Sequence, residues 1–119
     1  MNRLAAVITL LVTVACSGNP IIREATEVAA FTVPPGEPKP SISTSRHANG
    51  IGASWTLPTP REWPAYCREL RQRLEPRYVW KSQSDDEIVF SRTLEADVYR
   101  LTVRRDGPLL RAELLATPF

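Results

Sequence analysis

Residues 86–117 read DEIVFSRTLEADVYRLTVRRDGPLLRAELLAT and carry the strongest structural signal in the chain. Three runs within them, residues 86–94, 97–104 and 109–117, alternate apolar and polar side chains with a period of two. Such alternation is typical of strands that bury one face and expose the other. Asp106-Gly107 is a tight-turn signal between the last two runs. The stretch therefore predicts an antiparallel sheet that is covered on one side only.

Three more strands are predicted upstream. Residues 42–47 and 51–57 flank Asn49-Gly50, a pair that suits the two positive-φ positions of a type I′ hairpin turn. Residues 77–82 form a further strand-like run directly before the C-terminal meander.

An amphipathic helix is predicted over residues 60–75. Thr59 and Glu62 have the spacing of a capping box, Pro60 suits the first turn, and Pro76 ends the helix. The apolar side chains recur at helical spacing and define one face: Trp63, Tyr66, Cys67, Leu70 and Leu74.

One helix packed on an antiparallel sheet predicts a small two-layer α+β sandwich for residues 41–119. We expect Trp55, Trp63 and Trp80 in its core, between helix and sheet, because aromatic side chains bury a large area each.

Residues 16–40 precede this domain and are rich in proline, which removes backbone donors and restricts φ. They predict a semi-rigid linker of up to tens of ångströms, at about 3.1 Å per extended residue. Within the linker, residues 22–31 have the potential to order as a short helix or as a strand that docks on the domain. Both alternatives stay open.

Residues 1–15 have the layout of a secretory signal peptide, with Arg3 before an apolar run. The run covers residues 4–15, and its 12 residues are too few for a membrane span, which needs about 20. The segment predicts export from the cytoplasm.

Residues 13–18, Thr-Val-Ala-Cys-Ser-Gly, resemble the lipobox of bacterial lipoprotein precursors. The resemblance implies cleavage between Ala15 and Cys16 and acylation of Cys16 with palmitate-type chains, up to a triacylated N-terminus. Two or more acyl chains give stable membrane attachment. In a two-membrane envelope, Ser17 after the cysteine implies sorting to the outer membrane, facing the periplasm.

The alternative is ordinary cleavage after Ala15, which leaves Cys16 with a free thiol. Such a protein would be a soluble secreted domain, for example a small-ligand binder, and Cys16 could then pair with Cys67. Without that bridge, Cys67 is expected to be an inert buried thiol on the apolar helix face.

Charge and motifs argue against several functional classes. Loss of Arg3 with the leader reduces the 15 basic residues to 14, interspersed with 13 acidic ones, so no basic stripe for nucleic acid is evident. His47 has no companion ligands at metal-binding spacing, and residues 85–87, Asp-Asp-Glu, fit a solvated turn better than a cation loop. No nucleophile, phosphate-loop or zinc motif is found. We expect no cofactor and no catalytic function.

The uncovered sheet face is the remaining candidate site. Apolar residues interleaved with arginines are common in protein interfaces, and the alternation places such a set outward: Val89, Val98, Leu109, Leu115, Arg100, Arg104 and Arg111. An ordinary exposed sheet, or one partly covered by residues 22–31, is the alternative. The expected function is a lipid-anchored, non-catalytic envelope protein that binds another envelope protein, either as an assembly accessory factor or as an immunity protein that inhibits a toxin or hydrolase.

Overall fold

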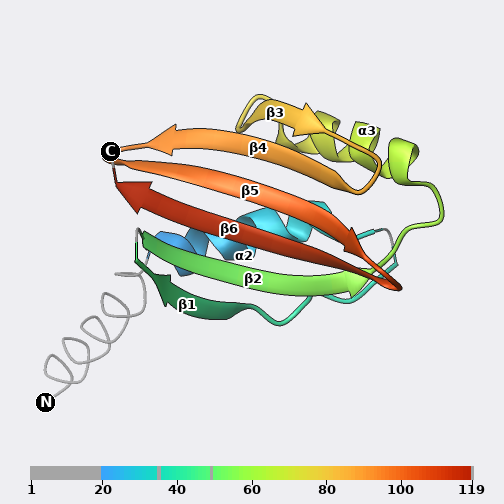
Figure 1. Ribbon diagram of the computed structural model, residues 1–119, viewed down its shortest axis with the longest axis horizontal. Coiled ribbons are helices and arrows are strands. Elements are labelled where there is room, and N and C mark those ends of the chain that lie inside the picture. Colours follow the sequence, from blue (N-terminus) through green and yellow to red (C-terminus); the bar gives the residue numbers. More distant parts are fainter. Residues whose placement is uncertain (1–19, 35, 49, 119) are drawn as a thin grey trace, which may run out of the picture.

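The structure is a computed structural model, and it describes residues 20–34, 36–48 and 50–118. The predicted signal peptide and Cys16 therefore fall outside it. Over these described residues, two helices and six strands follow one another (Figure 1): α2 (Pro20–Thr32), β1 (Ser43–His47), β2 (Gly50–Pro58), α3 (Trp63–Leu74), β3 (Val79–Gln83), β4 (Glu87–Leu94), β5 (Asp97–Asp106) and β6 (Leu109–Pro118).

All six strands join one antiparallel sheet in the order β1-β2-β6-β5-β4-β3. Strand β6 lies between β2 and β5, so the last strand of the chain connects the N-terminal hairpin to the C-terminal meander. The predicted α+β class and antiparallel sheet are confirmed. The prediction of a single helix is wrong, because the described part of the chain contains two.

The additional helix, α2, lies inside the stretch predicted as a linker. Its buried residues recur at helical spacing: Ile21, Glu24, Ala25, Val28, Ala29 and Thr32. That stripe packs against β2, β6 and α3, and Pro20 begins the helix, where its fixed φ is favourable. The structure thus decides between the two alternatives for residues 22–31 in favour of a helix. Within the predicted linker, residues 33–34 and 36–40 are the described residues that belong to no helix or strand.

The C-terminal end of α2 is held by side chains from two other elements. Tyr66 on α3 donates to the Thr32 carbonyl at 2.7 Å, and Trp55 on β2 donates through Nε1 to Thr32 Oγ1 at 3.0 Å. The Thr32 hydroxyl in turn donates to the Ala29 carbonyl at 2.7 Å. These contacts satisfy carbonyl groups that have no partner within the last helical turn.

Helix α3 begins later than predicted. Glu62 occupies the N-cap position without a side-chain hydrogen bond to the helix, and Pro64 lies in the first turn. The predicted capping box is wrong, because Thr59 Oγ1 donates to the Gly107 carbonyl at 3.2 Å instead. The predicted apolar face is confirmed, with Trp63, Tyr66, Cys67, Leu70 and Leu74 all buried.

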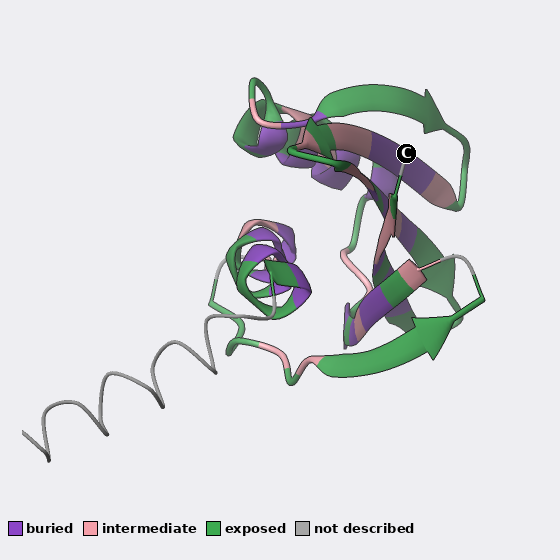
Figure 2. Ribbon diagram, turned by 90° about the vertical axis from the view of Figure 1, so that its left-hand side faces the viewer, coloured by how far each residue is buried: buried purple, intermediate pink, exposed green. Residues whose placement is uncertain are grey.

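The sheet curves around the two helices, which both lie on the same side of it (Figure 2). The core forms between them, and the residues that contribute from the sheet alternate along each strand, for example Ile88 and Phe90 on β4, or Leu101 and Val103 on β5. Because α2 lies on this side, it leaves the opposite face of the sheet uncovered. We call that face the open face.

Trp55 and Trp63 lie in the core, but the prediction for Trp80 is wrong. Trp80 is 37 % exposed, and the Arg71 guanidinium lies 4.2 Å from the centre of its ring. The reason is its position on β3, an edge strand whose five residues are all exposed. The Arg71 guanidinium, instead of the apolar core, covers this face of the ring in a cation–π contact.

The β1–β2 hairpin forms as predicted, with a shifted turn. His47 pairs with Gly50, so Gly50 belongs to β2 and not to the turn, and Asn49, the other residue of the predicted turn, is not among the described residues. A Cβ on Gly50 would lie 2.0 Å from the Ala116 carbonyl oxygen, so glycine is needed there for close approach to β6. The turn predicted at Asp106-Gly107 is shifted by one residue, because Asp106 pairs with Leu109 and the strands are connected by Gly107, with a φ of +62°, and Pro108.

Within the described ranges, no helix is long and apolar enough to cross a membrane.

Candidate functional site: the open face of the sheet

The pairing register puts the predicted surface residues on the open face. Phe90, Leu101 and Leu114 face the core in one row across β4, β5 and β6. Alternation then turns their neighbours outward, and the row that follows contains Val89, Thr102 and Glu113. The same alternation places the others outward: Val98, Arg100, Arg104, Leu109, Arg111 and Leu115.

These residues are not equally accessible. Val89 is only 3 % exposed, between Ser82 on β3 and Thr102 on β5, so it offers a partner little area. Val98 and Leu115 are half-buried. Leu109 is 45 % exposed, but it is the first residue of β6 and so lies at one end of the sheet. The accessible part of the open face is therefore centred on the arginines.

The arginines line a shallow hollow of about 340 Å³, formed by Glu87, Arg100, Thr102, Arg104, Arg111, Glu113 and Leu115. We call these residues the arginine hollow. They come from β4, β5 and β6, three interior strands of the sheet, where neighbouring strands on both sides hold the backbone in a defined register.

Two like charges lie directly opposite one another in this hollow. Arg104 on β5 pairs with Arg111 on β6, an arrangement that destabilises a sheet unless anions compensate it. Glu87 compensates Arg104, since its Oε2 accepts hydrogen bonds from Nε at 3.0 Å and Nη2 at 2.7 Å. These hydrogen bonds raise the pKa of Arg104. Arg111 makes a longer contact of 3.7 Å with Asp106, and both side chains are mostly exposed.

Arg100 is less compensated still. Its cross-strand neighbours are Ser91 and Leu115, which carry no charge. Among the described residues, no carboxylate forms an ion pair with it. The open face thus presents guanidinium groups that are available to carboxylates from outside the chain.

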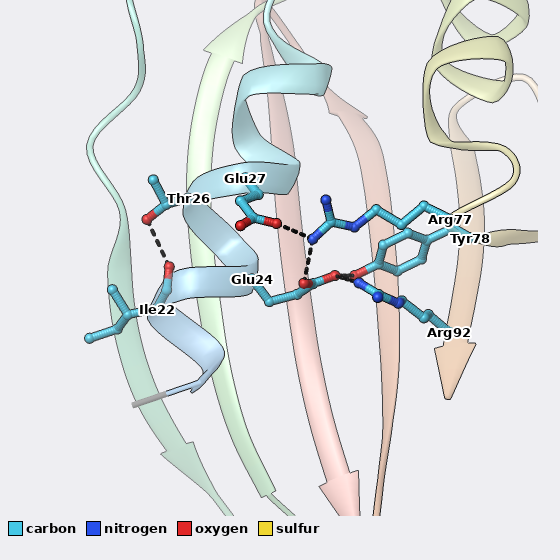
Figure 3. Close-up of polar contacts among 7 residues, drawn as sticks. All are labelled: Ile22, Glu24, Thr26, Glu27, Arg77, Tyr78 and Arg92. Carbon is cyan, nitrogen blue, oxygen red and sulfur yellow. Dashed lines mark hydrogen bonds and ion pairs between the residues drawn. The ribbon is translucent and has the colours of Figure 1, made fainter. Parts of the chain in front are cut away.

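A second charged cluster, around Glu24, was missed by the sequence analysis (Figure 3). Glu24 is 5 % exposed on α2. Its Oε1 accepts from Arg77 Nη2 at 2.6 Å, and its Oε2 accepts from Tyr78 Oη at 2.6 Å and Arg92 Nη1 at 2.8 Å. Arg77 also pairs with Glu27. The available signal was a carboxylate at a position of the apolar stripe of residues 20–32.

Both carboxylate oxygens of Glu24 accept hydrogen bonds within the cluster, whereas Arg77 Nε is buried without a hydrogen-bond partner among the described residues. Burial alone would raise the pKa of Glu24, but hydrogen bonds from Tyr78, Arg77 and Arg92 outweigh it and hold the pKa below its usual value. Burial and the hydrogen bond to Glu24 both raise the pKa of Tyr78. A carboxylate held ionised and a phenol held neutral are poorly suited to exchange protons, so we interpret this cluster as a structural clamp.

The other side chains considered in the sequence lie apart from the arginine hollow. His47 is exposed on β1, with Nε2 3.1 Å from Ser45 Oγ. Cys67 is a fully buried free cysteine, and burial raises the pKa of its thiol to about 11. Asp86 is exposed and accepts a hydrogen bond from Ser84 Oγ at 2.9 Å. Over residues 20–34, 36–48 and 50–118, no three His, Cys, Asp or Glu side chains are grouped to hold a metal ion. Ala15 and Cys16 precede this part of the chain.

In comparisons with known proteins, no family model, curated protein or solved structure matches this chain. The functional argument therefore depends on the geometry of the open face and on the sequence of the leader.

Proposed function

We propose that this chain is a lipid-anchored protein of the bacterial cell envelope that binds another envelope protein, without catalysis, through the open face of its sheet. One observation carries the binding proposal: Arg100, Arg104 and Arg111 gather on a face that neither helix covers, and Arg100 has no ion-pair partner among the described residues.

The chemistry of the arginine hollow favours a protein segment that presents carboxylates. A guanidinium binds a carboxylate through two parallel hydrogen bonds, which fixes orientation as well as charge. A partner carboxylate between Arg104 and Arg111 would also relieve their mutual repulsion. Half-buried Leu115 and Val98 lie beside the arginines and supply apolar contact area. Arginine beside apolar groups is a composition that protein interfaces favour.

The anchor is proposed from the lipobox resemblance of residues 13–18. Acylated Cys16 would hold the domain on a membrane, and Ser17 supports placement in the outer membrane on its periplasmic side. An assembly accessory factor and an immunity protein both fit this arrangement, since both bind a second protein through a rigid surface.

The binding proposal is tested by charge reversal on the open face. The mature domain, its Arg100→Glu/Arg111→Glu variant and an Arg61→Glu/Arg68→Glu control are immobilised and exposed to an envelope extract. The control changes the net charge equally, but its two exposed arginines lie at and beside α3 on the other side of the sheet. We expect a protein that is retained by the wild type and the control and lost from the open-face variant. Equal retention by all three proteins would exclude the arginine hollow as the binding surface.

The anchor is tested by metabolic labelling with radioactive palmitate. We expect label on the wild-type protein and none on Cys16→Ser, which should also leave the membrane fraction. Label-free wild-type protein in the aqueous fraction would instead support the soluble secreted alternative.

A further inference from the structure

One end of the molecule gathers apolar residues close to where the described chain begins. A hollow of about 250 Å³ is lined there by Pro20, Ile21, Gly50, Ile51, Asp97, Tyr99, Ala116 and Pro118. These residues belong to the start of α2, the start of β2, the start of β5 and the end of β6, which lie together at the left of Figure 1. We call this hollow and the adjoining Ile22 the N-terminal pole.

The N-terminal pole exposes large apolar side chains. Ile51 is 39 % exposed and lines the hollow, and Ile22, in the first turn of α2, is 42 % exposed. Leu109, which is 45 % exposed, begins β6 and so lies at the opposite end of the sheet from Pro118. Leu109 is therefore a matched control for Ile22 and Ile51, because it is similarly exposed but lies at the end of the sheet away from the N-terminal pole.

The docking of α2 shortens the proposed tether. Had residues 16–40 formed a linker, the domain could stand tens of ångströms from the bilayer. Because α2 begins at Pro20, only four peptide links separate this helix from Cys16, and a chain spans at most about 14 Å over four residues. The headgroup layer on one side of a bilayer already occupies roughly 5–8 Å.

We infer that the N-terminal pole rests on the lipid bilayer, with Ile22 and Ile51 in its interfacial layer. This inference rests on the proposed acylation of Cys16. The contact needs little affinity of its own, because the short tether makes it intramolecular and its effective concentration high. The strands then run away from the membrane, and the arginine hollow faces sideways, where a neighbouring envelope protein can reach it.

The charges at this end do not require anionic lipid. Asp97 lines the hollow and Glu95 lies in the adjacent β4–β5 turn, whereas Arg46 lies near the end of β1. Because both signs are present, apolar burial is the expected driving term, and zwitterionic phosphatidylcholine is the suitable test surface.

The experiment measures the depth of single probes in vesicles. Acylated full-length protein with Ile51→Cys, Ile22→Cys or Leu109→Cys is labelled with a thiol-reactive fluorophore and reconstituted in phosphatidylcholine vesicles. Some of the vesicle lipids carry a quencher at the headgroup boundary. The native thiols do not interfere, since Cys67 is fully buried and acylated Cys16 has no free thiol. We expect quenching at positions 51 and 22 to exceed that at position 109 at least twofold. Lengthening the tether by 20 glycine and serine residues after Ser17, to a mean span of roughly 25 Å, should reduce the difference.

The outcomes separate this inference from the function on which it depends. Acylated protein that floats with the vesicles but shows equal quenching at positions 51, 22 and 109 overturns the inference and leaves the anchor in place. Protein that carries no acyl chain and stays in the aqueous fraction overturns both.

Discussion

Tyr78 donates a hydrogen bond to Glu24 across 54 residues of sequence, with 2.6 Å between Oη and Oε2. Arg92 on β4 donates to the same oxygen, and Arg77 donates to the other. Because Glu24 is almost fully buried, these donors replace the water that its carboxylate has in the unfolded chain. The contact fastens α2 to β4 and to the residues before β3, and so couples this helix, which packs on β2 and β6, to the strands that lie beyond β5 in the sheet.

Replacing Glu24 is expected to destabilise the protein strongly. Glu24→Gln removes the negative charge that compensates two partly buried guanidinium groups, so Arg92 loses its ion pair and Arg77 keeps the exposed Glu27 in place of a buried partner. The free energy of unfolding should fall by about 2–4 kcal/mol, measured by urea titration of the circular dichroism signal. Glu27→Gln is the control, since Glu27 contacts the same Arg77 but is 49 % exposed, and its loss should cost less than about 1 kcal/mol. Equal losses for both variants would contradict the role given to burial.

Acid should weaken the same contact. The pKa of Glu24 is lowered in the folded protein from an ordinary value of 4.5, so the unfolded chain takes up its proton first as the pH falls. The stability that Glu24 contributes is therefore fully present above pH 4.5 and is lost as the pH falls through the folded-state pKa. Unfolding free energies measured between pH 7 and pH 2.5 should show the wild type and Glu24→Gln converging below pH 4.5. A gap that stays constant to the lowest pH would argue against an ionised Glu24 in the fold.

The end of α2 provides a third test. Thr32→Val removes the hydroxyl that accepts from Trp55 and donates to the Ala29 carbonyl, which leaves the buried indole N–H unpaired. We expect a loss of about 1–3 kcal/mol in unfolding free energy. Thr26→Val is the matched control, because Thr26 lies on the same helix and its hydroxyl donates to the Ile22 carbonyl at an exposed position. That variant should change stability by less than about 0.5 kcal/mol.

Two glycines of β2 should differ in their tolerance of a methyl group. The Cβ of Gly50→Ala would meet the Ala116 carbonyl oxygen at 2.0 Å, and backbone on a paired strand cannot move aside cheaply. In Gly52→Ala the nearest atom, at 2.7 Å, is the exposed His47 ring, which can rotate away. Thermal unfolding should show a loss of about 2–3 kcal/mol for the first variant and less than about 1 kcal/mol for the second. A similar melting temperature for both would mean that β2 and β6 separate at Gly50 without cost.

The local sequence pattern predicted the helices, strands and turns more reliably than it predicted the contacts between them. The α3 face from Trp63 to Leu74 and the turn at Gly107 agree with the structure because each depends on a few adjacent residues. The helix start was misplaced because Thr59, a good capping residue, bonds to Gly107 far along the chain. The sequence did not decide the conformation of α2, because its apolar stripe lies between proline-rich segments and its stability depends on contacts with distant elements such as β2, β6 and α3.

The same division holds for the candidate site. Alternation along β5 and β6 was sufficient to predict that Arg100, Arg104 and Arg111 share a face. It could not predict that Arg104 lies opposite Arg111, since that depends on the register between the strands. Nor could it predict that Val89 is covered by its neighbours or that Glu24 meets Tyr78, Arg77 and Arg92.

The amino-acid sequence alone determined the periodicity of this protein: strands with one apolar face, a helix with one apolar stripe, and arginines on the solvent-exposed face of the sheet. It could do so because backbone geometry imposes a period of two on strands and 3.6 on helices whatever lies around them. Only the tertiary structure decided which face α2 covers, why Trp80 stays at the surface and where Glu24 finds its donors. Those outcomes depend on strand order and on contacts between residues tens of positions apart, which become favourable only when the whole core has assembled.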